Sequence, residues 1–194
     1  MTSSSPKLSK AMNRIQETDI DSLLTDPSDS ASKSFVTVVF LATDPFDLDP
    51  TETHQAVPFT CSSVHEFLRQ GLQNHPFVVI TEKNRHECSA IQLGQILSKR
   101  SSCPFRIIYK TKENPHEILE EANHAIGQVL ASCELENKII QKTKDIFKEA
   151  QYNELFTSRD FKQAKEVLRA RVRQKIESEP EKFLEDAISR IRTF

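Results

Sequence analysis

The sequence predicts an α/β fold, a doubly wound and mainly parallel sheet of four to five strands with a helical C-terminal extension. Short apolar runs rich in β-branched residues recur through the middle of the chain. Helix-like stretches with one apolar face separate these runs. Strands that alternate with helices favour parallel pairing, because each helix returns the chain to the edge where the next strand starts.

Composition divides the 194 residues into three parts. Residues 1–34 are rich in Ser and Thr, hold four basic and five acidic residues and have few large apolar side chains, so we expect a disordered N-terminal arm. The weak helical spacing of Leu8, Met12, Ile15 and residues 20–24 leaves a segment that folds on a partner as the alternative. Residues 35–150 carry the alternation of strands and helices and form the expected α/β domain. Residues 151–194 have apolar residues at helical spacing and form the expected helical extension.

Four runs are expected to be strands, because they are rich in Val, Ile, Phe or Tyr and have turn-forming residues at their ends. They are Phe35–Leu41, Ala56–Cys61, Pro76–Ile80 and Pro104–Tyr109. The run at 56–61 has the weakest pattern of the four.

Helices are expected between and after these strands. Ser63 followed by Glu66 is a capping-box pattern, which marks the start of the first helix. Residues 90–97 carry a second apolar stripe, and a third helix opens at Pro115, since proline is favoured at the first helical position. The stretch 178–181 places a Ser, a Pro and a Glu at capping positions and predicts a final helix there.

Three aspartates, Asp44, Asp47 and Asp49, follow the first expected strand. In an open α/β sheet, ligands bind outside the carboxyl ends of the strands, so acids at this place are candidate ligands of Mg²⁺. Asp and Pro are also common in turns that end strands, so a solvated loop is the alternative. No other cofactor is expected.

The composition argues against several classes of function. With only three glycines, neither a P-loop nor a G-x-G-x-x-G motif can be written, so nucleotide binding of those kinds is not expected. A net charge of -2 gives no support for nucleic-acid binding, although the basic residues concentrated in 162–175 keep a nucleic-acid-binding regulator as an alternative. No apolar run reaches the roughly 20 residues that cross a bilayer. Four separated cysteines and no apolar N-terminal signal favour free thiols in a reducing cytoplasm.

Asp44, Thr81 and Thr111 each end or follow an expected strand. In this order and spacing the central region, about residues 35–145, resembles the receiver domain of bacterial response regulators, a five-stranded doubly wound fold that accepts a phosphoryl group on an aspartate. The resemblance aligns Asp44 with the acids that hold Mg²⁺, Thr81 with the phosphoacceptor that ends the third strand, and Thr111 with the Ser or Thr that ends the fourth. Residues 122–132 then take the place of the fifth strand.

The departures from that family decide what the resemblance implies. Thr81 cannot form the acyl phosphate that an aspartate forms, and the lysine expected after the fifth strand falls near Cys133. Only one acid of the usual pair aligns, which leaves too little charge to hold Mg²⁺ against water. The resemblance therefore implies a pseudo-receiver, a signalling or scaffold module that acts by binding and has no catalytic residues. The alternative is that residues 122–132 are helical and that the sheet has four strands and belongs to another family.

An Mg²⁺-dependent phosphotransfer enzyme is the second hypothesis. Residues 47–51 match the D-x-D-x-T signature of haloacid-dehalogenase-like phosphohydrolases, in which the first Asp is the nucleophile and the second the general acid. That chemistry needs the first Asp directly at the end of the strand, whereas residues 42–46 intervene here. The sequence therefore leans away from an enzyme.

The C-terminal helices carry the clearest indication of function. Their apolar residues recur every three or four positions, so each helix has an apolar stripe that needs to be covered. We expect a protein partner or a second copy of the chain to cover it through Phe183, Ile191 and Phe194, together with Arg169 and Arg173.

Overall fold

The computed structural model describes residues 6–25, 35–41, 56–82, 87–110, 115–150 and 158–180. The chain forms two compact units. Residues 30–133 make the first, which we call the α/β unit, and residues 1–29 together with 134–194 make the second, which we call the helical unit. The helical unit is therefore discontinuous in sequence, because the residues of the α/β unit separate its two segments along the chain.

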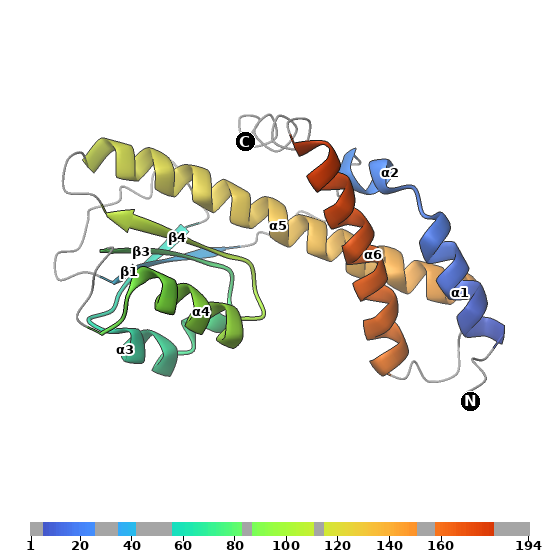
Figure 1. Cartoon of the computed structure of the whole chain (residues 1–194), viewed down its shortest axis with the longest axis horizontal. Helices are drawn as coiled ribbons and strands as arrows, with labels where there is room; N and C mark the ends of the chain where they lie inside the picture. The colour runs from blue at the N-terminus through green and yellow to red at the C-terminus, as the bar shows by residue number, and fades with distance from the viewer. Residues whose placement is uncertain are drawn as a thin grey trace. The chain divides into compact units, whose positions relative to one another are not determined.

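The α/β unit contains a four-stranded parallel sheet, as the alternating pattern predicts (Figure 1). The strands are β1 (Val36–Leu41), β2 (Ala56–Thr60), β3 (Phe77–Glu82) and β4 (Phe105–Lys110). Their order across the sheet is β2-β1-β3-β4. The central strands β1 and β3 read as nearly continuous apolar runs, because helices bury both of their faces.

Helix α5 (Pro115–Glu149) covers one face of the sheet, and α3 (Val64–Arg69) and α4 (Ala90–Arg100) cover the other (Figure 1). Successive strand residues point to opposite faces, so Phe40 and Ile80 pack under α5 while Val39 and Val79 pack under α3 and α4. Burying each such Phe or Ile contributes roughly 1.5–3 kcal/mol. This unit is thus a three-layer sandwich of helix, sheet and helix.

The two helices α3 and α4 begin at serine caps. The Ser63 hydroxyl accepts a hydrogen bond from the Glu66 amide at 3.0 Å, as the capping pattern predicts. In a complete capping box the Glu66 carboxylate would also accept a hydrogen bond from the Ser63 amide. Here it accepts hydrogen bonds from the amide and the hydroxyl of Ser62 instead. The complete capping box is at α4, where Ser89 and Gln92 each bond the other's backbone amide.

Helix α5 replaces the fifth strand that the receiver resemblance implies. Residues 122–132 are helical, and α5 begins at Pro115 as expected. Its apolar residues recur every three or four positions, which buries a single helical face, whereas a strand would need alternation. The residues of this face in the α/β unit are Ile118, Ala122, Ala125, Ile126, Val129 and Cys133. The sheet therefore has the four-stranded form that the sequence left as an alternative.

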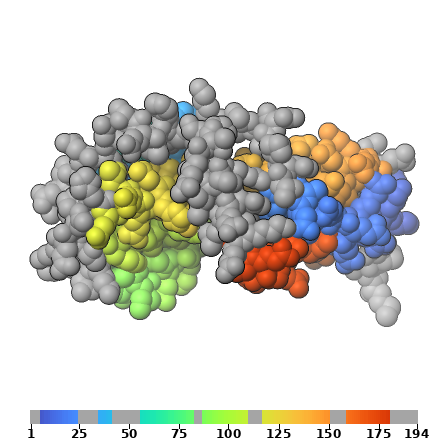
Figure 2. Space-filling view, turned by 90° about the horizontal axis from the view of Figure 1, so that it is seen from above, coloured from blue at the N-terminus to red at the C-terminus, as the bar shows by residue number. Residues whose placement is uncertain are grey.

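The helical unit contains α1 (Pro6–Glu17), α2 (Ile20–Thr25), the part of α5 from Glu134 onward and α6 (Ser158–Ser178). Its core is a cluster of apolar side chains from all four helices, with Ala11, Ile15, Ile20, Leu23, Ile139, Ile146, Phe147, Ala150, Ala164, Leu168 and Val172 buried. The space-filling view shows α1 and α2 lying against α5 and α6 in this unit (Figure 2).

This arrangement differs from the disordered arm that the composition of residues 1–34 predicts. Residues 6–25 form two helices, and Ala11 and Ile15 of α1 are fully buried. The spacing of Leu8, Met12 and Ile15 gives α1 one apolar stripe, and packing against α6 supplies the burial that an isolated 12-residue helix lacks. The structure also divides the chain at 133/134, inside α5, and not at 150.

Two further predictions are placed as follows. The final helix expected from the capping pattern at 178–181 falls almost wholly beyond residue 180, outside the described residues. Within the described ranges, no helix is both long and apolar enough to cross a membrane.

Candidate functional site

The carboxyl edge of the sheet is the first place to look for a site. The register pairs Phe40 with Thr60, Leu41 with Thr81 and Glu82 with Lys110, so all four strands end at the same edge. In the order β2-β1-β3-β4, strand β2 lies on one side of β1, and β3 and β4 lie on the other side. The direction in which strands are added therefore reverses between β1 and β3. This is the topological switch point at which open α/β sheets bind their ligands.

Thr81 stands at that switch point, at the end of central strand β3. Its side chain is buried, with an exposed fraction of 1%. Its hydroxyl donates a hydrogen bond to the Leu41 carbonyl oxygen at 3.3 Å and lies 3.5 Å from the Glu82 carbonyl oxygen. The hydroxyl therefore joins the ends of β1 and β3.

The amino end of α3 lies beside this edge and is occupied by the chain's own carboxylates. The Glu66 carboxylate accepts hydrogen bonds from the Ser62 amide at 2.8 Å and from its hydroxyl at 2.7 Å, and these bonds lower the pKa of Glu66. The Glu87 carboxylate, from the segment after β3, accepts the Val64 amide at 3.0 Å. Carboxylates are favoured here, because the first amides of a helix have no partner within the helix.

Cys61 follows β2 at the same edge. Its thiol is buried, and its sulfur is 4.0 Å from the Gln70 side-chain oxygen. Burial, and then the negative charge of Glu66, raise the pKa of the Cys61 thiol. A raised pKa keeps the sulfur protonated at neutral pH, so Cys61 is a packing residue and a poor nucleophile. All four cysteines are free thiols, as the sequence predicts.

Several predicted site residues lie outside the described residues. They are Asp44, Asp47, Asp49, Thr111, Phe183, Ile191 and Phe194. Among the residues that are described, no three His, Cys, Asp or Glu side chains gather in a way that could hold a metal ion. That finding does not extend to the aspartates after β1.

The predicted partner-binding arginines of α6 have different surroundings. Arg169 is held by Glu136 of α5, with Nε donating to the carboxylate at 2.8 Å, and it also contacts Glu166. The Glu136 carboxylate raises the pKa of Arg169 further above its ordinary range. Arg173 is exposed. Of the two, Arg173 is the more exposed, whereas the Arg169 side chain is partly buried and paired within the chain.

Other cations of α6 also bind within the chain. Lys165 lies 3.8 Å from Glu136, and Arg171 donates to the Ile15 carbonyl at the end of α1. Lys175 contacts Asp21 at 3.3 Å and Glu179 at 2.7 Å. Much of the positive charge in 162–175 thus serves to hold the helical unit together.

The exposed side of α6 has a shallow hollow of about 520 Å³ that is open to solvent. The residues that line it are Arg159, Lys162, Gln163, Glu166, Val167 and Ala170. All of them belong to one helix, and both signs of charge are present. The hollow therefore lacks the convergent polar groups that are typical of a ligand-binding site.

Sequence reasoning missed two groups that shape these regions. Glu87 caps α3 from across the chain, and no sequence signal links it to Val64, which lies 23 positions away. Glu136 gathers Lys165 and Arg169 onto α5. The sequence does place an acid, Glu136, on the long helix and two basic residues, Lys165 and Arg169, four positions apart on the next helix. That spacing is the signal from which an ion-pair cluster could have been predicted.

The geometry defines a parallel α/β unit of four strands joined to a helical unit. In comparisons with protein-family models, curated proteins and solved structures, nothing matches this chain.

Proposed function

We propose that this protein acts by binding another protein or a second copy of itself, as a non-catalytic signalling or scaffold module with a receiver-like sheet. The observation that carries the proposal is the position of Thr81. In a receiver-like fold the end of the third strand carries the reactive group, and here a buried hydroxyl bonded to the Leu41 carbonyl takes that place. A hydroxyl used in this way stabilises the sheet and does not face a ligand.

The strand order supports the same proposal. The order β2-β1-β3-β4 equals the first four strands of the flavodoxin-like order 2-1-3-4-5. Beside the carboxyl edge of the sheet, the carboxylates of Glu66 and Glu87 cap the start of α3, and the Cys61 thiol is buried in the core. These groups are suited to holding the backbone in place.

Helix α5 supports a linking role. It has 35 residues, far more than the mean of roughly 11–12, and continues from the α/β unit into the helical unit. A single helix shared by two compact units is a direct covalent connection between a receiver-like part and a part that could dock. The partner would be contacted through Phe183, Ile191 and Phe194, with Arg173 attracting acidic groups.

Sedimentation velocity of the intact chain tests this proposal. We expect a species larger than the monomer, or a monomer that forms a complex with its partner, and loss of that association in the double variant Phe183→Ser with Ile191→Ser. Replacing the exposed Glu120 and Glu121 on α5 by Gln is the matched control and should change nothing. Association that is unchanged in the double variant would place binding elsewhere and overturn the proposed surface.

A further inference from the structure

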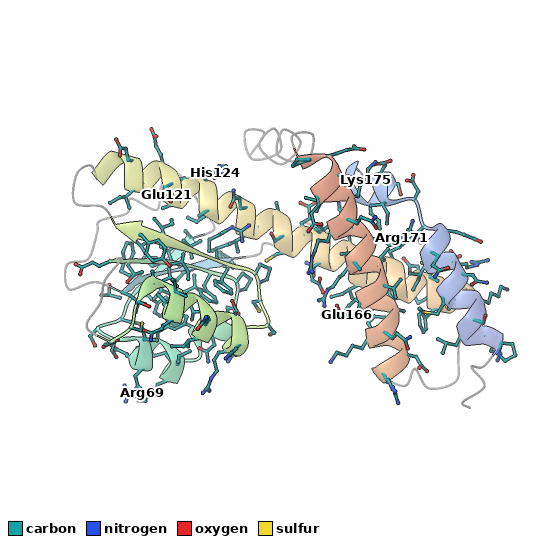
Figure 3. The ribbon with its side chains drawn as sticks, viewed as in Figure 1. Arg69, Glu121, His124, Glu166, Arg171 and Lys175 are labelled. Atoms are coloured by element: carbon teal, nitrogen blue, oxygen red, sulfur yellow. The ribbon has the colours of Figure 1, made fainter. Side chains whose placement is uncertain are left out.

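The connection between α4 and β4, residues 101–104, lies at the amino edge of the sheet and forms neither helix nor strand. The ribbon in Figure 3 shows it joining the end of α4 to the start of β4. Ser102 is exposed in this connection, and its hydroxyl makes no hydrogen bond to any residue that the structure describes. The Ser102 hydroxyl is therefore accessible to another protein.

The residues on either side of Ser102 are fixed to η1 (Leu72–Asn74), the short 3-10 helix that follows α3. The Ser101 hydroxyl donates to the Gln73 carbonyl oxygen at 2.9 Å and accepts the Cys103 amide at 3.1 Å. The Cys103 sulfur lies 3.2 Å from the carbonyl oxygen of the last residue of η1. Ser101 thus holds the backbone in place, and its anchored position keeps the neighbouring Ser102 at the surface.

Two exposed cations precede Ser102. Lys99 and Arg100 belong to the last turn of α4, three and two positions before the serine, where positive charge complements the helix dipole. Neither forms an ion pair with a residue that the structure describes, in contrast to Arg169 and Lys175 of α6. Both charges are thus available to a partner that approaches Ser102.

A free serine preceded by two basic residues is the pattern that basophilic protein kinases recognise. Kinases select substrates partly by charge pattern, and acidic side chains of such a kinase pair with the basic residues before the acceptor serine. A kinase binds this segment in an extended conformation, and the backbone of Ser101 is already extended, with φ −97° and ψ 135°. The last turn of α4 has to open for Lys99 and Arg100 to continue the extended path, and helix ends open at little cost in free energy.

Ser98 lacks the same features and provides an internal comparison. It is also exposed, but it lies within α4, and Gln95 and Ile96 occupy the positions three and two residues before it. An acidic kinase site would find no partner there. Exposure alone therefore does not distinguish the two serines, whereas backbone conformation and preceding charge do.

We propose that Ser102 is a phosphorylation site, modified by a serine kinase that recognises basic residues before its acceptor. In the transfer, the Ser102 Oγ forms a bond to the γ-phosphorus of ATP while the bond from that phosphorus to the bridging oxygen of ADP breaks. ADP leaves, and the hydroxyl proton passes to the catalytic aspartate of the kinase. The product carries a charge of about −1.5 to −2, which the neighbouring Lys99 and Arg100 partly neutralise. The modification is independent of the proposed function, because Ser102 lies at the edge of the sheet opposite to Thr81.

Kinase treatment of the intact, folded chain tests the site. The probe is the catalytic subunit of cyclic-AMP-dependent protein kinase, a basophilic serine kinase, supplied with ATP and Mg²⁺. We expect phosphate at Ser102, located by fragmentation mass spectrometry, and its loss in Ser102→Ala. Ser98→Ala, the same change at the exposed serine within α4, should leave the phosphate at Ser102 unchanged.

The initial rate of transfer to Ser102 tests the two cations. Lys99→Gln with Arg100→Gln should lower this rate by roughly tenfold or more, because the acidic groups of the kinase lose their partners. Arg69→Gln, which removes an exposed cation at the end of α3 (Figure 3), is the matched control and should leave the rate unchanged. A folded chain that takes up no phosphate at Ser102 overturns the proposal, and so does an equal rate in the double variant and the original chain.

Discussion

At the scale of single residues, three described polar side chains near the carboxyl edge of the sheet form hydrogen bonds with backbone groups. Thr81 bonds the Leu41 carbonyl, Glu66 bonds Ser62, and Glu87 bonds the Val64 amide. Sequence patterns locate such residues at strand ends and helix starts, which is why Thr81 and Ser63 could be singled out. They do not reveal the partner when it lies far along the chain, because a hydrogen bond across 40 positions depends on how the strands pair.

The Thr81 hydroxyl is expected to stabilise the pairing of β1 with β3. Thr81→Val keeps the shape of the side chain and removes the donor, so local stability should fall by about 1 kcal/mol. Hydrogen exchange of the 36–41 and 77–82 backbone amides measures this loss. Thr60→Val, the same change at an exposed position at the end of β2, should cost less than about 0.5 kcal/mol. Equal losses in the two variants would contradict a structural role for the Thr81 hydroxyl.

Glu66 should make stability depend on pH in a predictable direction. Its hydrogen bonds from Ser62 lower its folded pKa below the ordinary value of about 4.3, so the ionised carboxylate stabilises the folded state above that pH. The contribution is lost as the pH falls through the folded pKa. Glu66→Gln should therefore lower the melting temperature near neutral pH and have little effect in acid. Glu120→Gln, which removes a carboxylate at an exposed position of α5, is the control and should leave the melting temperature near neutral pH unchanged.

At the scale of elements, the strands and the starts of α3 and α5 could be predicted from the sequence, since alternation and capping are local signals. The fifth strand could not be decided, because small apolar residues at 122–132 fit either element until it is known what they pack against. The docking of α1 was missed for a related reason. A polar, Ser-rich segment with one short apolar stripe is disordered or helical according to whether a complementary surface exists.

Edge strand β2 illustrates how one residue sets the properties of an element. The Cys61 amide bonds the Phe40 carbonyl of β1, so by alternation the backbone groups of Ala56, Pro58 and Thr60 point to the free edge. Pro58 thus places its missing donor outward, where it leaves the pairing with β1 intact and blunts the edge against further strands.

Restoring a backbone N–H donor at position 58 should allow the edge of β2 to pair with strands of other molecules. Pro58→Val adds one outward amide to a strand that has no charged residue and exposes Val57 and Phe59. We expect concentration-dependent association, measured by light scattering, with thioflavin fluorescence rising in parallel. Thr60→Val changes an outward residue that already has its amide and should not associate. A Pro58 variant that behaves like the original chain would show that the edge is blocked by something other than proline.

At the scale of the whole molecule, the chain is a parallel sheet unit inserted into a helical unit, with α5 belonging to both. The sequence predicts the two kinds of structure but places the boundary at 150, because the apolar spacing of α5 does not change where the helix leaves the sheet. A helical pattern likewise does not show which surface covers an apolar stripe, which is why the sequence favours a second chain as the cover for the stripe of α6. The stripe is covered by α1, a segment more than 140 positions away whose own apolar stripe is short and lies in a Ser-rich part of the chain.

The central proposal is that the four-stranded parallel sheet belongs to a binding module and does not carry out phosphoryl chemistry. Incubation of the intact chain with acetyl phosphate and Mg²⁺, followed by intact-mass spectrometry, tests it most directly. The account predicts no phosphoryl adduct, because Thr81 is buried in a hydrogen bond and cannot take the role of the acceptor. An acid-stable, base-labile phosphoryl group on Asp44, Asp47 or Asp49 would contradict it and would make the loop after β1 a phosphotransfer site.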